Sequence, residues 1–292
     1  MSCSGIVVVI PTLGRSPHYR RLFESLSEQT IAPDHVVVVV QGDHDAVERS
    51  AAGTPDLPIE IVHHSPGLSA SRNYGIECCG THWRGVLIPD DDLWLADTTI
   101  EHAATLANAP SERIMVYAGR VSRPASSRDR VQYLNEAQEL DRRTVWKSAL
   151  EGGLLISREA FMATGGFDEA LGLGSPGPYQ SGEGTDLLLR VMDAGGSVEF
   201  EPQLQFYEDE PGLPRSEMLT KVRSYARGTG RVYRMRYGAA GRSGLVLRTV
   251  AKLTLCLARR DGLGVARSWN ELLGRVEGLT GWVASPKTGR TA

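Results

Sequence analysis

Three consecutive aspartates, Asp90, Asp91 and Asp92, follow the short apolar run 86–88. Neighbouring carboxylates repel one another, and burial increases the cost because it disfavours the charged form. A bound cation would offset this cost, and carboxylate oxygens suit Mg²⁺ or Mn²⁺. Residues two apart in an extended chain face the same side, so we predict that Asp90 and Asp92 point together and that Asp91 points away. The alternative is an Asp-rich turn that caps a helix at 93–97.

The segments around the aspartates alternate between apolar strand patterns and helical patterns. We expect strands at 6–10, 35–40, 59–64 and 84–89, and helices at 18–30 and 69–79. This alternation is typical of an α/β sheet with parallel strands. Ligands of such sheets bind beyond the carboxyl ends of the strands. Polar residues follow each of these strands, in the segments "PTLGR", "QGD", "HSPG" and "PDDD", so we expect the ligand site at this edge.

The rest of the chain divides into a second set of strands and a basic helical segment. We predict a strand at 113–121, a strand, helix and turn at 152–169, a loop at 172–182, a helix at 185–196 and a strand at 197–202. Residues 1–211 contain 16 Lys+Arg and 31 Asp+Glu, whereas residues 212–292 contain 16 Lys+Arg and 4 Asp+Glu. We therefore predict an α/β domain at 1–211 and a basic helical extension at 212–292, with an anionic partner for the extension.

Helical spacing within the extension places Arg248, Lys252 and Arg259 beside an apolar surface, in the segment 245–260. Such a helix can lie on anionic lipid, or it can pack against the α/β domain as amphipathic helices often do. The N-terminus lacks the pattern of a signal peptide. We expect a cytoplasmic chain, with a peripheral contact at the inner face of the cell membrane and no nucleic-acid partner.

Five segments occur in an order that resembles family 2 glycosyltransferases. They are "VVVIPTLGR", "GLSASRNYGI", "VLIPDDDLWL", "GGLLISREAFMATGGFDE" and "GEGTDLLLR". The resemblance covers roughly residues 5–210, and "SYARGTGRVYR" is similar to a helix that often follows in that family. It implies a GT-A fold, which is a Rossmann-like α/β domain, followed by a C-terminal helical extension.

The resemblance also implies a reaction. A divalent cation, Mn²⁺ or Mg²⁺, would assist transfer of a sugar from a nucleoside-diphosphate donor, expected to be a UDP-sugar, to an acceptor hydroxyl with inversion. The acceptor could be a small molecule, a lipid-linked molecule or a glycan. Two alternatives remain, a sugar-phosphate nucleotidyltransferase and a catalytically inactive module that binds nucleotide sugars.

The donor-site residues implied by the resemblance come from the turns after the strands and from the "SRN" helix. The nucleotide-binding set is Pro11, Thr12, Arg15, Gln41, Asp43, Arg72, Asn73, Asp90 and Asp91, and the metal ligands are Asp90 and Asp92. Arginine suits a diphosphate because its guanidinium can donate two parallel hydrogen bonds. The segment "QGD" departs from the usual "DDGS", which leaves the nucleobase open.

The catalytic residues implied by the resemblance are Glu183, Asp186 and Asp168. A carboxylate beside the acceptor hydroxyl could act as the base. The family usually carries a Glu-Asp pair at this helix start, and Gly184 replaces the second acid here. We favour Glu183 as the base over Asp186; the alternative is that both acids complement the positive helix end. Asp168 would face the acceptor, and Glu208 or Asp209 could replace the family's histidine metal ligand.

Overall fold

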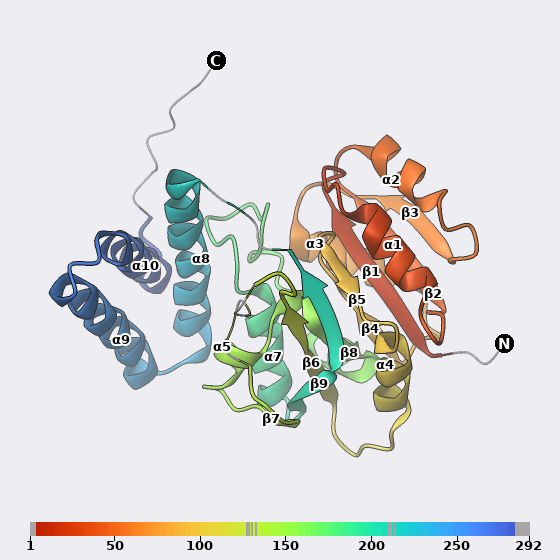
Figure 1. The fold of residues 1–292 in the computed structure, drawn as a ribbon. Helices are drawn as coiled ribbons and strands as arrows, with labels where there is room; N and C mark the ends of the chain where they lie inside the picture. The colour runs from red at the N-terminus through yellow and green to blue at the C-terminus, as the bar shows by residue number, and fades with distance from the viewer. Residues whose placement is uncertain are drawn as a thin grey trace. The chain divides into compact units, whose positions relative to one another are not determined.

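The computed structural model describes residues 4–126, 129, 131, 133–209, 212 and 214–283. The chain forms two compact units (Figure 1). The first unit comprises residues 1–168 and 187–211, and the second comprises residues 169–186 and 212–292. The predicted boundary between residues 211 and 212 coincides with one of the points where the chain passes between units. The second unit also includes the predicted Gly- and Pro-rich loop.

The sheet of the first unit begins with four parallel strands. These are β1 (Ile6–Thr12), β2 (His35–Val40), β3 (Ile59–His63) and β4 (Gly85–Leu87). Strand β1 pairs in parallel with both β2 and β4, and β2 pairs in parallel with β3. The Val and Ile side chains of β1 and β2 are buried, as expected for a parallel sheet covered on both faces. The predicted parallel order of this half is confirmed.

The remaining strands make the sheet mixed. Strand β8 (Leu154–Ser157) runs antiparallel to β4 and to β6 (Met115–Ser122), and β6 pairs in parallel with β9 (Ser197–Glu208). Strands β5 (Leu93–Leu95) and β7 (Gln138–Glu139) both pair antiparallel with β9. The strand order is β3-β2-β1-β4-β8-β6-β9-β5. Strands β5 and β7 are absent from the sequence-based expectations.

Seven α-helices belong wholly or partly to the first unit within the described residues. They are α1 (Tyr19–Ser27), α2 (His44–Ala51), α3 (Leu68–Cys78), α4 (Thr99–Asn108), α5 (Val145–Ser148), α6 (Arg158–Thr164) and α7 (Glu183–Asp193). Helix α1 buries Tyr19, Leu22, Phe23 and Leu26, the residues whose spacing predicts it. Helix α2 buries Val47 alone, so its sequence lacks the apolar repeat that would reveal a helix. The expectation that no helix lies between the strands at 35–40 and 59–64 was therefore wrong.

The second unit contains three long helices, which confirms the predicted helical extension. These are α8 (Arg215–Arg236), α9 (Ala239–Ala258) and α10 (Gly262–Thr280). Helices α8 and α10 approach closely: a Cβ added at Gly278 would lie 2.1 Å from the Arg227 carbonyl oxygen. Among the described residues, none of these or the other helices combines the length and apolar character needed to span a membrane.

Replacing Gly278 with Ala is expected to destabilise the second unit, because the added methyl group would push α10 away from the α8 backbone. Overpacking of this kind costs about 1–3 kcal/mol. Thermal unfolding of Gly278→Ala should show a lower Tm than the wild type. The matched control is Gly262→Ala, since a Cβ there meets nothing within 4 Å. Equal melting temperatures for the two variants would contradict the close packing of α8 against α10.

Candidate active site

The three aspartates lie in a tight turn between β4 and β5. The Leu93 N–H donates to the Asp90 carbonyl oxygen at 3.1 Å and closes the turn. Strand β5 then begins at Leu93, so no helix starts here for the aspartates to cap. The capped helix at 93–97 is therefore a wrong interpretation. The chain also turns at 91–92 instead of staying extended, so the prediction that Asp90 and Asp92 point together loses its geometric basis and stays a prediction.

Asp91 faces the end of β1, and the prediction that it points away from Asp90 and Asp92 stays a prediction. Its carboxylate accepts hydrogen bonds from the Thr12 hydroxyl and, at 3.4 Å, from the Tyr19 hydroxyl. The Ser16 hydroxyl donates to the Asp91 carbonyl oxygen at 3.0 Å. Burial and then the charge of Asp90 raise the pKa of Asp91, and the Thr12 hydrogen bond opposes them. Asp91 thus fixes the aspartate turn against the segment that follows β1.

Asp90 forms an ion pair with Arg72 of α3, with 2.9 Å between Nη2 and Oδ1. The Arg72 side chain is fully buried. It also lies 3.7 Å from the Glu151 carboxylate and 5.5 Å from the centre of the Phe167 ring. A buried guanidinium is costly unless anions compensate its charge, and two carboxylates do so here. Arg72 therefore holds Asp90 in place as well as supplying positive charge beside the turn.

Asp92 occupies the most negative environment of the turn. Its side chain reaches solvent, yet the protein atoms packed around the carboxyl, and then the charges of Asp90, Asp91 and Glu208, raise its pKa to about 6. Oxygen donors in such surroundings suit a hard divalent cation, which commonly takes one or two carboxylates together with substrate phosphates. Within the described residues, no group of three or more His, Cys, Asp or Glu is arranged to hold a metal ion.

The two acids proposed as an additional metal ligand already have cationic partners. Glu208 pairs with Arg123 at 2.8 Å, and both side chains are largely buried. Asp209 lies 3.3 Å from Arg21 and 3.9 Å from His18. Among the acids predicted as metal ligands, those of the aspartate turn are therefore the ones to consider for a cation.

The turns after β1 and β2 meet beside the aspartate turn. The Asp43 N–H donates to the Leu13 carbonyl oxygen at 3.2 Å, and a Cβ at Gly14, where φ is +75°, would lie 2.0 Å from the Asp43 carbonyl oxygen. The Asp43 carboxylate accepts from the Asp45 N–H at 3.1 Å and caps α2. Gln41 Oε1 accepts from the Gly67 N–H at 2.7 Å. Glycine is required at position 14 because L-residues rarely adopt such a backbone.

Two more of the predicted nucleotide residues differ in exposure. Pro11 is a buried residue within β1, in register with Val39 of β2. Arg15 is exposed, three residues after Thr12. The structure thus brings together the turns carrying Thr12, Arg15, Gln41 and Asp43. The nucleotide-binding roles of these residues stay predictions.

Asn73 holds the turn that carries Asp168. Its side-chain amide donates to the Phe167 carbonyl oxygen at 3.0 Å and accepts from the Phe167 N–H at 2.8 Å. Arg190 of α7 donates to the Gly166 carbonyl oxygen at 2.7 Å and also to that of Thr164. Asp168 itself is partly buried. The contacts of Asn73 are those of a residue that orients the Asp168 turn.

Glu183 and Asp186 lie in the first turn of α7, in the portion that belongs to the second unit. The Asp186 N–H donates to the Gly182 carbonyl oxygen at 2.9 Å. The Asp186 carboxylate is fully buried and pairs with Arg236 of α8, with 2.6 Å between Nε and Oδ1. Glu183 is 2% exposed. The Asp186 carboxylate therefore has a guanidinium of α8 as its partner.

Sequence reasoning missed four residues that position the predicted ones. They are Tyr19, Glu151, Arg190 and Arg236. Tyr19 has the apolar spacing of a core residue, and Arg236 lies in a helix with several other arginines, so neither residue stands out. The "LLLR" ending of the α7 motif does contain Arg190. An arginine immediately after an apolar run could have indicated a side chain that is held near the core by hydrogen bonds.

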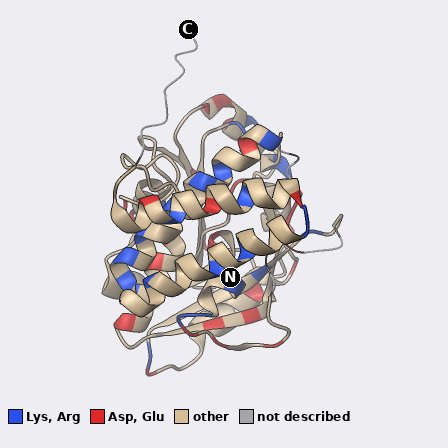
Figure 2. Ribbon diagram, turned by 90° about the vertical axis from the view of Figure 1, so that its left-hand side faces the viewer, with Lys and Arg blue, Asp and Glu red and all other residues tan. Residues whose placement is uncertain are grey.

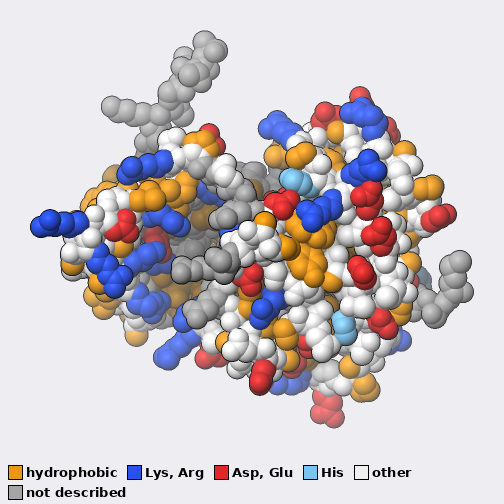
Figure 3. Space-filling view, in the orientation of Figure 1, with side chains coloured by type: hydrophobic (Ala, Val, Ile, Leu, Met, Phe, Trp, Pro, Cys, Tyr) orange, Lys and Arg blue, Asp and Glu red, His pale blue; other side chains and the backbone are white. Residues whose placement is uncertain are grey.

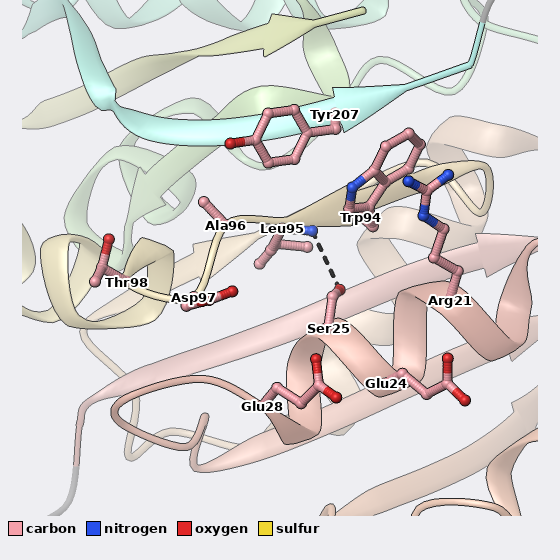
Figure 4. Close-up of a pocket in the computed structure, with 10 residues that line it drawn as sticks. All are labelled: Arg21, Glu24, Ser25, Glu28, Trp94, Leu95, Ala96, Asp97, Thr98 and Tyr207. Carbon is pink, nitrogen blue, oxygen red and sulfur yellow. Dashed lines mark hydrogen bonds between the residues drawn. The ribbon is translucent and has the colours of Figure 1, made fainter. Parts of the chain in front are cut away.

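A surface hollow lies beside strand β5, and its lining contains none of the predicted nucleotide residues (Figure 4). Arg21 lies over the Trp94 ring, 3.2 Å from its centre, and the Trp94 ring stacks on that of Tyr207 at 5.7 Å. The full lining is Arg21, Glu24, Ser25, Glu28, Trp94, Leu95, Ala96, Asp97, Thr98 and Tyr207. Because Arg21 covers the Trp94 ring, that ring is not available for a ligand to stack on.

Comparisons with solved structures identify the fold. A mannosyltransferase, PcManGT from Pyrobaculum calidifontis in complex with GDP-Man and Mn²⁺, has a TM-score of 0.62 at 16% identity, covering 94% of this chain and 86% of that one. The S. aureus protein TarS (residues 1–349) in complex with UDP-GlcNAc has a TM-score of 0.56 at 11% identity, covering 94% and 92%. The mixed α/β sheet is therefore that of GT-A glycosyltransferases, as predicted.

Comparisons of sequence identify the family. The pre-mycofactocin glycosyltransferase of Mycobacterium tuberculosis is 30% identical over 212 residues, which is 68% of this chain and 41% of that protein. An uncharacterized glycosyltransferase of Haemophilus influenzae is 22% identical over 76% of this chain and 71% of that one. The chain thus spans less than half the length of the mycobacterial relative. The model described as glycosyl transferase family 2 matches residues 7–162, and the chain belongs to this family.

Proposed function

We propose that this chain is a metal-dependent glycosyltransferase, which moves a sugar from a nucleoside-diphosphate donor to an acceptor hydroxyl with inversion. The observation that carries the proposal is the aspartate turn at the carboxyl end of β4. Asp91 contacts Thr12 at the end of β1, Asp90 pairs with the buried Arg72, and Asp92 remains in the negative environment between them. Three carboxylates kept together in this way favour a divalent cation, and the cation in turn would bind the diphosphate.

The donor would lie across the carboxyl ends of β1, β2 and β4. Arg15, in the turn after β1, and Arg72, which pairs with Asp90, would supply positive charge to the diphosphate. Asp92, with Asp90, would hold the cation. Bound Mn²⁺ or Mg²⁺ would neutralise negative charge that develops on the diphosphate leaving group. Two solved neighbours support this class of donor, since one is complexed with GDP-Man and Mn²⁺ and the other with UDP-GlcNAc.

The nucleobase would meet Gln41 rather than an acid. Because Gln41 Oε1 accepts the Gly67 N–H, its NH₂ group is left to donate hydrogen bonds. A donor at this position suits a carbonyl oxygen on the base, and uracil presents two of them. A UDP-linked donor therefore stays our proposal, with a GDP-linked donor as the alternative that a donor screen would reveal.

Glu183 would act as the base that takes the acceptor proton. A general base needs a carboxylate that can accept a proton during the reaction. Asp186 is held in a buried ion pair with Arg236, and protonation of Asp186 would break that pair. The pair with Arg236 supports Asp186 as a residue that orients the start of α7, and the resemblance favours Glu183 as the base. Asp168 would face the acceptor from the turn held by Asn73.

The acceptor would be a small molecule, a lipid-linked molecule or a glycan. The surplus of positive charge in residues 212–292 supports a peripheral contact of this segment with an anionic membrane, which would bring the enzyme to acceptors at that surface. We propose that the α/β domain of residues 1–211 carries the donor chemistry and that the helical extension of residues 212–292 serves this localisation.

Removal of divalent cations should abolish turnover. We expect release of nucleoside diphosphate from a panel of UDP- and GDP-sugars in Mn²⁺, loss of this release in EDTA, and recovery when Mn²⁺ or Mg²⁺ is restored. Asp92→Asn should reduce turnover by about 100-fold or more, since one preorganised electrostatic contact is worth that much. The matched control is Asp56→Asn, which changes an exposed aspartate outside the turn.

The same assay separates the proposal from its alternatives. A nucleotidyltransferase would instead release pyrophosphate from a nucleoside triphosphate and a sugar phosphate. An inactive module would bind nucleotide sugars without turnover. Full activity in EDTA, or an Asp92→Asn variant as active as the wild type, would contradict metal-dependent transfer at this turn.

The two acids of α7 should respond differently to removal of their charge. Glu183→Gln should reduce kcat by about 100-fold or more, because a positioned base contributes that much, while the Kd for nucleoside diphosphate and the Tm stay close to wild type. Asp186→Asn should lower the Tm, because it leaves the Arg236 guanidinium without its counter-ion. Calorimetry and thermal unfolding provide the two readouts. If Asp186→Asn is inactive but stable while Glu183→Gln stays active, Asp186 would be the base and Glu183 the orienting residue.

A further inference from the structure

Exposed apolar side chains gather on the last two helices of the second unit (Figure 3). Among the described residues, the large apolar side chains that are at least 40% exposed in this segment are Leu247, Val250, Leu255, Leu257, Leu263, Trp269, Val276 and Trp282. Elsewhere the described exposed large apolar residues are Leu13, Met162 and Leu173. Apolar surface concentrated in this way marks a surface for binding a partner or a membrane.

Helix α9 has an apolar face opposite the face that it packs. Thr249, which is buried, accepts a hydrogen bond from Arg275 of α10, and Cys256 lies 3.9 Å from Ser268 of the same helix. Leu247 and Leu257 point away from this contact and are 66% and 57% exposed. More than half of each leucine side chain is therefore exposed to water, which is unfavourable.

Helix α10 continues the apolar surface. Its Glu277 and Gly278 are buried, and a Cβ at Gly278 would meet the backbone of α8. Trp269 and Val276, seven residues apart and hence on one side of the helix, are 50% and 41% exposed. No charged residue lies in the stripe formed by Val265, Trp269, Leu272 and Val276. We call the exposed apolar surface of both helices, centred on Leu257 and Trp269, the α9–α10 face.

The charges around the α9–α10 face are mainly positive. Arg259, Arg260 and Arg267 are exposed near the connection between the two helices. Glu271 pairs with Lys252 at 2.8 Å and with Arg275 at 2.6 Å, whereas Asp261 caps α10 through the Gly264 N–H. Lys and Arg recur along the helices of this unit (Figure 2). The acids near the face are thus engaged, and the arginines at its edge supply the net charge.

This arrangement differs from the basic stripe expected from the sequence. Two members of that stripe have partners inside the unit: Arg248 donates to the Tyr233 hydroxyl at 3.2 Å, and Lys252 pairs with Glu271. The helix therefore packs within its own unit, and the alternative that it packs against the α/β domain stays a prediction. The apolar α9–α10 face with Arg259, Arg260 and Arg267 is a different surface, and it spans two helices.

We propose that the α9–α10 face binds the surface of an anionic phospholipid bilayer. Leu257 and Trp269 would enter the headgroup boundary, where tryptophan is favoured, and the arginines would meet lipid phosphates, as in interfacial helices. Pairing of two copies of this chain through the face would bring like charges together, which is unfavourable. The inference extends the peripheral contact named in the proposed function, and its chemistry is independent of donor binding.

Flotation of the full-length protein with lipid vesicles tests the proposal. We expect recovery with vesicles of phosphatidylcholine mixed with phosphatidylglycerol, little recovery with phosphatidylcholine alone, and a decrease at high salt because screening weakens the charge term. The double variant Leu257→Ser with Trp269→Ser should lower partitioning about tenfold or more, because it removes apolar surface that would leave water. The double variant Arg259→Ser with Arg260→Ser should also lower partitioning about tenfold or more, because each basic side chain near such a surface contributes to binding. The matched control, Met162→Ser, changes an exposed apolar residue of the first unit and should float like the wild type.

The result that would overturn the proposal is equal flotation of the wild type and both double variants, or no flotation of any. A wild-type dimer in size-exclusion chromatography that the apolar double variant converts to a monomer, without flotation of either, would assign the face to self-association. The altered side chains are exposed, and unchanged Tm values would confirm that each variant folds. Failure of nucleoside diphosphate to raise the Tm would count against the donor proposal alone, since flotation does not need a donor.

Discussion

Mutual repulsion among Asp90, Asp91 and Asp92 is the constraint around which the first unit is organised. The turn keeps all three carboxylates together at the end of β4, and each neighbouring element compensates one of them. Helix α3 contributes Arg72 to Asp90, and the end of β1 with the start of α1 contributes Thr12 and Tyr19 to Asp91. Burial and then the charges of Asp90, Asp91 and Glu208 raise the pKa of Asp92. In the proposed function, a divalent cation would compensate this negative charge.

A second set of contacts orients the groups that we propose to face the acceptor. In the first unit, Asn73 and Arg190 both hold the backbone of the turn before Asp168. In the second unit, Arg236 of α8 holds Asp186 at the start of α7. Helix α8 is in turn fixed by α10, whose Gly278 allows the two backbones to approach. The helical extension therefore supports the geometry of the α7 acids as well as presenting the α9–α10 face.

Much of the fold could be predicted from the sequence, because strands β1 to β3 consist largely of β-branched residues and α1 has regular apolar spacing. Helix α2 could not, since it buries Val47 alone, and three-residue β5 is too short to show a period. The order of the motifs identified the candidate site residues, but it did not identify the residues with which they form ion pairs. Arg72 and Asp90 are 18 residues apart and Arg236 and Asp186 are 50 apart, and side-chain type does not reveal which distant charges will meet.

The central claim is that the aspartate turn holds a divalent cation together with the donor diphosphate. Crystals grown with Mn²⁺ and a nucleoside diphosphate, measured near the manganese absorption edge, would locate the ion directly. The account predicts an anomalous peak about 2.1 Å from an Asp92 oxygen and from oxygens of the diphosphate, the distance expected for such small divalent ions. A diphosphate bound at the carboxyl ends of β1 and β4 with no anomalous peak at Asp92 would contradict it.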